Sequence, residues 1–375
     1  MTMTKSEARA LLKHLFMAGI EAAHPAQCLG PHLPPSPKGR VIVLGAGKAA
    51  GAMAAAFEQH WQGPAPEGMV ITRYGHNADT KHIEIREAAH PVPDEAGVAA
   101  TEEALRLAEC AGADDLVIVL LSGGASALLV APQQGVTLSD KQNMIREMLA
   151  SGADIAAINK ARTALSRVKG GKLAHAAHPA PIHTFAISDV VGDDPAIIGS
   201  GPSHAKGAPY TIIANGKAAL NAIEAAADMN VIRLGDELTG DAQRVALEHA
   251  AQIKAMRLSE PTLLISGGEL TLTLPRPHGF GGPSRHYALC LHHALQDSCT
   301  YHALIADSDG SDGEDPEGTP AVAGAFIHSG KAEGAARAIE TADSASYFAS
   351  RNDSLITGPT GTNVNDLRLI LLLPR

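Results

Sequence analysis

Aromatic residues are scarce in this chain: they make up 3% of its 375 residues and include a single tryptophan. Proteins that bind single-stranded nucleic acid usually stack bases on aromatic side chains, so this scarcity argues against such a role. The formal net charge is −10 and no basic stripe stands out, which argues against binding to a phosphate backbone. We therefore expect no nucleic acid partner.

Cysteine is also sparse, and no long hydrophobic run is present. The four cysteines form no CxxC pair, so we expect reduced thiols in a cytoplasmic protein. No apolar run approaches the roughly 18 residues that cross a bilayer, and no signal peptide is evident. We expect no membrane attachment. The cysteines are Cys28, Cys110, Cys290 and Cys299.

The chain does contain a series of short apolar runs that each end in a loop of small or acidic residues. A continuous apolar run bounded by turn residues is typical of a fully buried parallel strand. Ligands of open α/β sheets bind outside the carboxyl ends of such strands. The loops offer backbone amides, one lysine and many carboxylates, which suit a phosphate and its metal ion. The runs are 41–44, 116–121, 185–187, 263–265 and 303–306.

Helical patterns follow most of these strands, which predicts an α/β fold. A chain of 375 residues favours two domains over one core. We expect each domain to have a mostly parallel sheet covered by helices. The boundary is placed in the charged helix predicted at 236–256, which gives a Rossmann-like N-terminal domain at 1–238 and a C-terminal α/β domain at 239–375.

The loop after the first strand matches GxGxxA, a loose form of the dinucleotide fingerprint. Gly45 and Gly47 would let a phosphate approach the backbone, and Lys48 would place a cation beside it. A dinucleotide site requires an acidic residue at the end of the next strand, where this chain has Arg73. No GxxxxGK[ST] P-loop is present. The alternative interpretation is a tight turn with a solvated lysine.

Two Ser-Gly-Gly loops follow two other predicted strands. Successive glycine amides can form an anion-binding nest, to which hydroxyl groups add donors. The alternative is a turn that needs positive φ. The first loop contributes Ser122, Gly123, Gly124 and nearby Ser126, and the second contributes Gly267, Gly268 and the carboxylate of Glu269.

Acidic and basic residues complete the set of candidates. Asp189, Asp193 and Asp309 lie in Asp/Gly loops and could hold Mg²⁺, which needs only one or two carboxylates beside phosphate and water. Their alternative is a surface turn. A basic helix is predicted at 159–171, with Arg162, Ser166 and Lys169 on one face, where an anionic substrate could dock. The alternative there is a solvated basic face.

Several blocks in this order resemble the glycerate 2-kinase family, which carries a C-terminal MOFRL domain and is often labelled hydroxypyruvate reductase. The resemblance covers most of the chain. It implies two α/β domains, the second of MOFRL type, with the active site in the cleft between them. It also implies ATP-dependent phosphorylation of glycerate at its 2-hydroxyl. The blocks are 45–50, 121–126, 162–171, 188–193, 200–202, 267–269, 307–313 and 357–367.

Two blocks depart from the family pattern. Gly-Gly-Arg-Asn-Gln-Glu is replaced by 281–286, in which Arg285 could substitute for the expected arginine, and Thr163-Ala164 replace the usual Lys-His. Both changes fall where substrate choice would be set, so a related hydroxy acid is an alternative to glycerate.

The resemblance and the loop chemistry together assign expected roles. Lys48, Asp189 and Arg285 are the catalytic candidates, and Asp193, Glu269 and Asp309 are the metal candidates. Substrate would contact Arg162, Ser122 and Ser126, while ATP would lie on the glycines. The expected cofactors are ATP and Mg²⁺, the expected partner is a small hydroxy acid, and a homodimer is possible. The alternatives are an NAD(P)-dependent hydroxypyruvate reductase and an inactive sugar-acid or nucleotide sensor. The glycines are Gly45, Gly47, Gly123, Gly124, Gly267 and Gly268.

Overall fold

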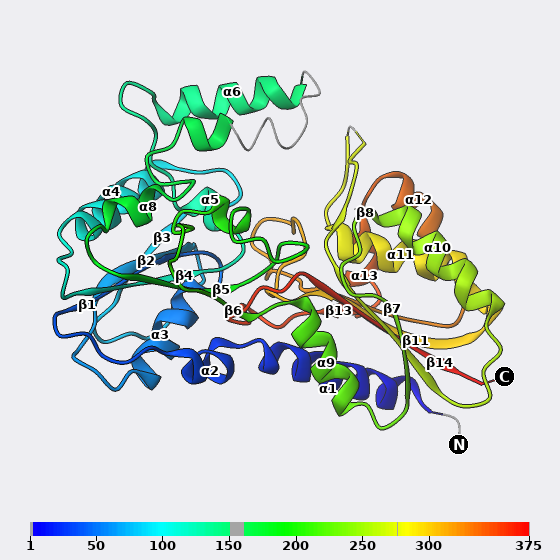
Figure 1. Cartoon of the computed structure of the whole chain (residues 1–375). Coiled ribbons are helices and arrows are strands. Elements are labelled where there is room, and N and C mark those ends of the chain that lie inside the picture. Colours follow the sequence, from blue (N-terminus) through cyan, green and yellow to red (C-terminus); the bar gives the residue numbers. More distant parts are fainter. Residues whose placement is uncertain (1–2, 151–160, 276, 375) are drawn as a thin grey trace. The chain divides into compact units, whose positions relative to one another are not determined.

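The computed structural model describes residues 3–150, 161–275 and 277–374. The chain folds as two compact units of the α/β class, as the sequence predicts. We call them the N-terminal unit, His24–Asn215 with Gly361–Asn363, and the C-terminal unit, Met1–Ala23 with Gly216–Thr360 and Val364–Arg375. The C-terminal unit thus includes both ends of the chain (Figure 1). The boundary expected after residue 238 would assign residues 1–23 and 216–238 differently, and it stays a prediction.

A six-stranded sheet forms the centre of the N-terminal unit. Its strand order is β3-β2-β1-β4-β5-β6, and every neighbouring pair is parallel, as predicted. The carboxyl ends of β1, β4 and β5 therefore lie side by side at one edge. The strands are β1 (Val41–Ala46), β2 (Glu67–Arg73), β3 (Glu84–Ala88), β4 (Leu116–Leu121), β5 (Ile182–Ile187) and β6 (Tyr210–Ala214).

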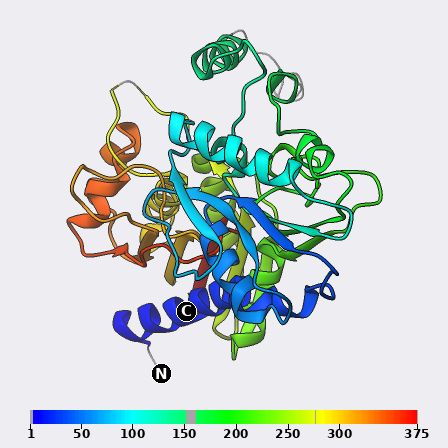
Figure 2. The same cartoon turned by 90° about the vertical axis from the view of Figure 1, so that its left-hand side faces the viewer.

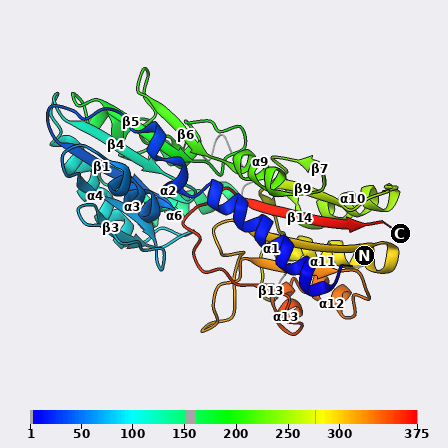
Figure 3. The ribbon, with the colours of Figure 1, turned by 90° about the horizontal axis from the view of Figure 1, so that it is seen from below.

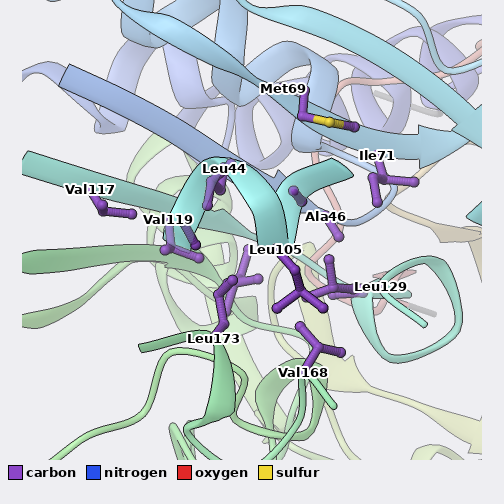
Figure 4. Packing of buried hydrophobic residues seen from close by; sticks show 14 of the residues in the cluster. Leu44, Ala46, Met69, Ile71, Leu105, Val117, Val119, Leu129, Val168 and Leu173 are labelled. Atoms are coloured by element: carbon purple, nitrogen blue, oxygen red, sulfur yellow. The ribbon is translucent and has the colours of Figure 1, made fainter. Parts of the chain in front are cut away.

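Helices cover both faces of this sheet, because its strands are apolar on both sides. Alternate residues such as Leu44 and Val119 pack against Leu105 of α4 and Leu173 of α8 (Figure 4). On the other face lie α2 and α3 (Figure 1). Figure 2 shows α4 in cyan across the sheet, with α6 beyond it. The helices are α2 (Pro25–Cys28), α3 (Ala50–His60), α4 (Glu95–Glu109), α5 (Ala125–Leu128), α6 (Leu138–Ala150) and α8 (Lys172–Ala176).

The sheet of the C-terminal unit is mixed, which corrects the expectation of a second mostly parallel sheet. Its order is β13-β12-β11-β14-β9-β7, and only the β7–β9 pair is parallel. The segment from β11 to β12 contains no crossover helix, and antiparallel pairing needs none. The strands are β7 (Asn230–Gly235), β9 (Thr262–Gly268), β11 (Thr300–Asp307), β12 (Gly324–His328), β13 (Ser354–Leu355) and β14 (Asp366–Leu373), beside a small pair of β8 (Gly240–Asp241) and β10 (Leu270–Thr271).

One face of this second sheet packs against α10 and α11, and α1 and α9 cover the other (Figure 3). Thr4 caps α1 through a capping box with Glu7, and Leu12, Leu15 and Phe16 form its buried stripe. None of the helices in the described segments has the length and apolar character needed to cross a bilayer. The helices are α1 (Lys5–Ala22), α9 (Gly216–Ala226), α10 (Ala242–Ala255), α11 (Pro283–Leu295), α12 (Ala335–Glu340) and α13 (Ser344–Ala349).

Candidate functional site

The loops after β1 and β4 are hydrogen-bonded to each other at the carboxyl edge of the parallel sheet. The backbone N–H of Lys48 donates to the carbonyl of Gly123 at 2.8 Å. The N–H of Ala49 donates to the Ser122 hydroxyl at 2.9 Å. The Ser122 hydroxyl thus holds the loop and is buried, and its expected contact with substrate stays a prediction. These bonds fix the backbone position of Lys48.

Asp189 follows β5 and lies against the same loops. The amide of Asn363 donates to its Oδ2 at 3.3 Å. A Cβ at Gly123 would overlap both of these side chains, so only glycine lets the loop after β4 approach them so closely. Gly124, at φ 86°, lies beside the aliphatic part of Lys48. The structure therefore brings Lys48, the Gly123-Gly124 loop and Asp189 together.

Gly45 and Gly47 have packing roles that the sequence does not reveal. Gly45 is a residue of β1 itself, and a Cβ there would overlap the Leu120 carbonyl of the neighbouring strand. Gly47 has φ 138° and packs against the backbone of Ser122. The close approach of two backbone segments, 45–47 and 120–122, accounts for both glycines. Phosphate contact at them stays a prediction.

Gly47→Ala is expected to lower the free energy of unfolding by about 1–3 kcal/mol, the range for overpacking a filled site. The added methyl would meet Ser122 main-chain atoms, which cannot rotate away as a side chain can. The measurement is the urea midpoint. Gly112→Ala is the control, because the nearest atom to its Cβ is 3.7 Å away. Equal midpoints for the two variants would contradict this account of the loop.

Ser126 is held by a buried lysine. Lys169 Nζ donates to both the carbonyl and the hydroxyl of Ser126, each at 2.6 Å, and the hydroxyl also meets Ser200 Oγ at 2.9 Å. Lys169 is 2% exposed, and burial lowers its pKa well below the usual value for a lysine. Ser126 therefore orients a cation as well as offering its own hydroxyl.

A cavity of about 420 Å³ opens beside Gly124 and Ser126 within the N-terminal unit. Arg162 and Lys169 both line it, but they do not lie on one continuous helix as predicted. Residues 161–164 are helical, but Ser166 already pairs with Pro132 as an isolated bridge, and 159–160 lie outside the described residues. The backbone leaves the helix between these two residues, and both of them line the cavity.

Lys141 of α6 lines the same cavity, and the sequence analysis missed it. A lone lysine in an amphipathic helix gives no signal in the sequence, since such residues are usually solvated. Here Lys141 is only 6% exposed, and burial, with the nearby charges of Arg162 and Lys172, lowers its pKa to about 8. The remaining wall is His90, Pro91, Val92, Pro93, Ala127, Val130, Leu138 and Gln142.

The expected metal ligands belong to two units: Asp193 lies in the N-terminal unit, and Glu269 and Asp309 lie in the C-terminal unit. In the described residues, no three His, Cys, Asp or Glu side chains are placed to hold a metal ion. Asp193 accepts a hydrogen bond from Asn215 at 2.6 Å. Asp309 is buried, and its side chain accepts from the N–H of Ser311. Glu269 is exposed between β9 and β10. The metal role of these carboxylates stays a prediction.

The second Ser-Gly-Gly segment is part of a strand, which corrects the expected loop. β9 continues through Gly267 and Gly268, which pair with Leu367 and Asp366 of β14. A Cβ on Gly268 would overlap the backbone of Leu238, so the glycine admits a neighbouring chain segment. A phosphate nest at these two glycines does not fit this geometry.

Arg285 lies in the interior of the C-terminal unit with no exposed side-chain surface. Its Nε donates to Asp312 at 3.0 Å and its Nη1 to Asp315 at 2.5 Å. Burial raises the pKa of Asp312 to about 6, against the opposite effect of the Arg285 charge. The expectation that Arg285 pairs a substrate carboxylate does not fit this geometry. It lies in the first turn of α11 instead, and Pro283 is the first residue of that helix.

Two family models match the chain: "Domain of unknown function (DUF4147)" over residues 11–211 and "MOFRL family" over residues 262–366. The D-glycerate 2-kinase of Thermotoga maritima is 32% identical, covering 94% of this chain and 96% of that protein. The chain belongs to the glycerate 2-kinase family. Membership in the glycerate 2-kinase family agrees with the resemblance found in the sequence blocks.

Other members of the glycerate 2-kinase family support this placement. The crystal structure of a glycerate kinase from Thermotoga maritima superposes with a TM-score of 0.86 at 29% identity, covering 99% of this chain and 100% of that one. A protein of Agrobacterium vitis named "Putative hydroxypyruvate reductase" is 37% identical over 99% of this chain and 96% of its own length. The family thus carries both names that the sequence analysis anticipated.

Proposed function

We propose that this protein transfers the γ-phosphoryl group of ATP to the 2-hydroxyl of glycerate or a related small hydroxy acid. Relatives in its family are named glycerate 2-kinase or glycerate kinase, which are phosphotransferases with an alcohol group as acceptor. The observation that carries the proposal is the joining of Lys48, the Gly123-Gly124 loop and Asp189 at the carboxyl ends of β1, β4 and β5. Phosphoryl transfer needs positioning and charge neutralisation, which these groups offer.

Each of these groups has a separate role in the proposal. The Lys48 ammonium neutralises charge that develops on the transferring phosphoryl group. Asp189 orients the acceptor hydroxyl and takes up its proton, and Asn363 keeps the carboxylate in position through its amide. Arg162 pairs the acceptor carboxylate from the neighbouring cavity, and Ser126 lies beside it. Backbone amides of the 123–124 loop face the phosphates.

Magnesium would enter as the ATP complex. Mg²⁺ is commonly held by one or two carboxylates together with phosphate oxygens and water, so a dedicated cluster of protein ligands is not required. Asp189, or Asp193 in the next turn, is the carboxylate best placed in the chain to share it. Bound Mg²⁺ would screen the phosphate charge. The cytoplasm, where ATP is abundant, stays the expected compartment.

Incubation with Mg²⁺, ATP and a panel of hydroxy acids of three to five carbons should release ADP in proportion to phosphorylated acid. ³¹P spectra of the product would locate the phosphate on the 2-oxygen. NADH and NADPH oxidation with hydroxypyruvate is measured beside it and should stay at background, because β2 ends at Arg73 where an acidic residue would bind the ribose. Nicotinamide turnover without ADP would make the protein a reductase, and ligand binding without either turnover would make it a sensor.

A further inference from the structure

The cavity beside Gly124 is lined by three basic residues. Lys141, Arg162 and Lys169 all line it, and no aspartate or glutamate is among its lining residues in the described chain. Lys169 already donates to Ser126. A single carboxylate bound to Arg162 would leave the ammonium of Lys141 without a hydrogen-bond partner among the described residues.

Lys141 is the residue whose charge lacks compensation. It is 6% exposed, and among the described residues its ammonium has no hydrogen-bond partner. A buried charge without a partner is costly and is usually paired with an opposite charge or a ligand. Because Lys141 lines the cavity, an anion bound there would supply the missing partner. Lys141 thus offers an anion-binding position in the cavity that Arg162 also lines.

The remaining wall indicates what sort of molecule the cavity accepts. Pro91, Val92, Val130 and Leu138 give it an apolar side that a short carbon chain can contact. At its other end Gly124 adjoins the aliphatic part of Lys48. A ligand with its reacting hydroxyl near Lys48 and Asp189 would therefore extend its remaining groups toward the three cations.

We propose that the acceptor is a small hydroxy acid with a second anionic group, which binds Lys141 while its first carboxylate binds Arg162. This inference rests on the proposed kinase function and names the substrate class of the same site. The second group is a carboxylate or a phosphate ester, since both present oxygen acceptors to an ammonium ion. Glycerate would fill only the first of the two positions.

The first test measures binding to the full-length protein by calorimetry in the absence of ATP. 2-Hydroxybutanedioate and 3-phosphoglycerate represent the two kinds of acid with a second anionic group, and both are called dianions here because each has two anionic groups. 2-Hydroxybutanoate and glycerate are their monoanionic counterparts. At least one dianion should bind about 10-fold more tightly than its counterpart, the scale of one hydrogen bond to a charged group. The dianion that gains more identifies the second group, and equal affinity for dianions and monoanions would overturn the inference.

The second test removes the charge of Lys141. Lys141→Met should reduce the preference for the dianion at least 10-fold while binding of the monoanion changes little. Lys38→Met is the matched control, since Lys38 is an exposed lysine just before the amino end of β1. Thermal unfolding verifies that the Met variant folds, and replacing an unpartnered buried cation should not lower its stability. Equal loss of both acids, or loss confined to ATP, would overturn the inference.

These outcomes separate the inference from the kinase proposal. If no acid on the panel yields ADP, the kinase proposal fails, whatever the binding preference. If glycerate yields ADP but dianions neither bind more tightly nor react faster, the kinase proposal stands and the second anionic group is wrong.

Discussion

Lys48→Ala should lower kcat about 100-fold or more, because one preorganised donor at a developing charge has an effect of this size. The fold should be preserved. The position of residue 48 is set by main-chain bonds, in which its N–H donates to Gly123 and its carbonyl accepts from Thr72 Oγ1 at 3.4 Å. Alanine keeps both bonds. The measurement is steady-state ADP formation with saturating ATP and the best acceptor of the panel.

Lys38→Ala is the control for this experiment, since it removes the same charge from an exposed position of the same unit. A raised KM with unchanged kcat would show that Lys48 binds ground state and transition state alike. Turnover close to that of the wild type would contradict a catalytic role and leave the lysine as a solvated residue of a tight turn.

Arg285→Ala should lower the free energy of unfolding by about 3–5 kcal/mol, the cost of removing one partner from a buried ion pair. Asp312 and Asp315 would lose their cation, and Asp312 is itself buried. The urea midpoint of the C-terminal unit should therefore fall strongly. Arg337→Ala, at an exposed position in α12, should change the free energy by less than about 0.5 kcal/mol.

The same variant tests the expectation drawn from the sequence. If Arg285→Ala leaves the urea midpoint unchanged but weakens binding of the acceptor acid, Arg285 is a ligand residue and its interior position does not persist in the working enzyme. A strong fall in the midpoint, with normal acid binding in the protein that remains folded, supports the structural role.

Local sequence patterns predict the parallel sheet and its loops because strand, glycine and helix follow one another within a few residues. Val41–Ala46 and Leu116–Leu121 are recognisable for this reason, and Lys48, Gly123 and Asp189 are found by their place after such strands. The shared edge of parallel strands then brings them together without further information.

Long-range pairing is what the sequence does not show. Gly267 and Gly268 look like a loop, but their strand is extended by pairing with β14, a hundred residues later. Arg285 looks available to bind a substrate in the sequence, but in the fold it forms ion pairs with Asp312 and Asp315. Lys141 looks like any solvated lysine until its helix is packed. In each case the deciding neighbour is distant in the chain.

Asn363 joins the parallel sheet of the N-terminal unit from far along the chain. The strands of the N-terminal unit all lie between residues 41 and 214, so its sheet can form while the ribosome is still translating the second half of the chain. The amide that donates to Asp189 belongs to residue 363 and is therefore translated after all of these strands. The apolar stripe of α1 likewise packs against β11 and β14, which are translated much later than α1. A chain without residue 363 can thus contain the whole parallel sheet and still lack the Asn363 hydrogen bond to Asp189, so the proposed site would be completed after its sheet.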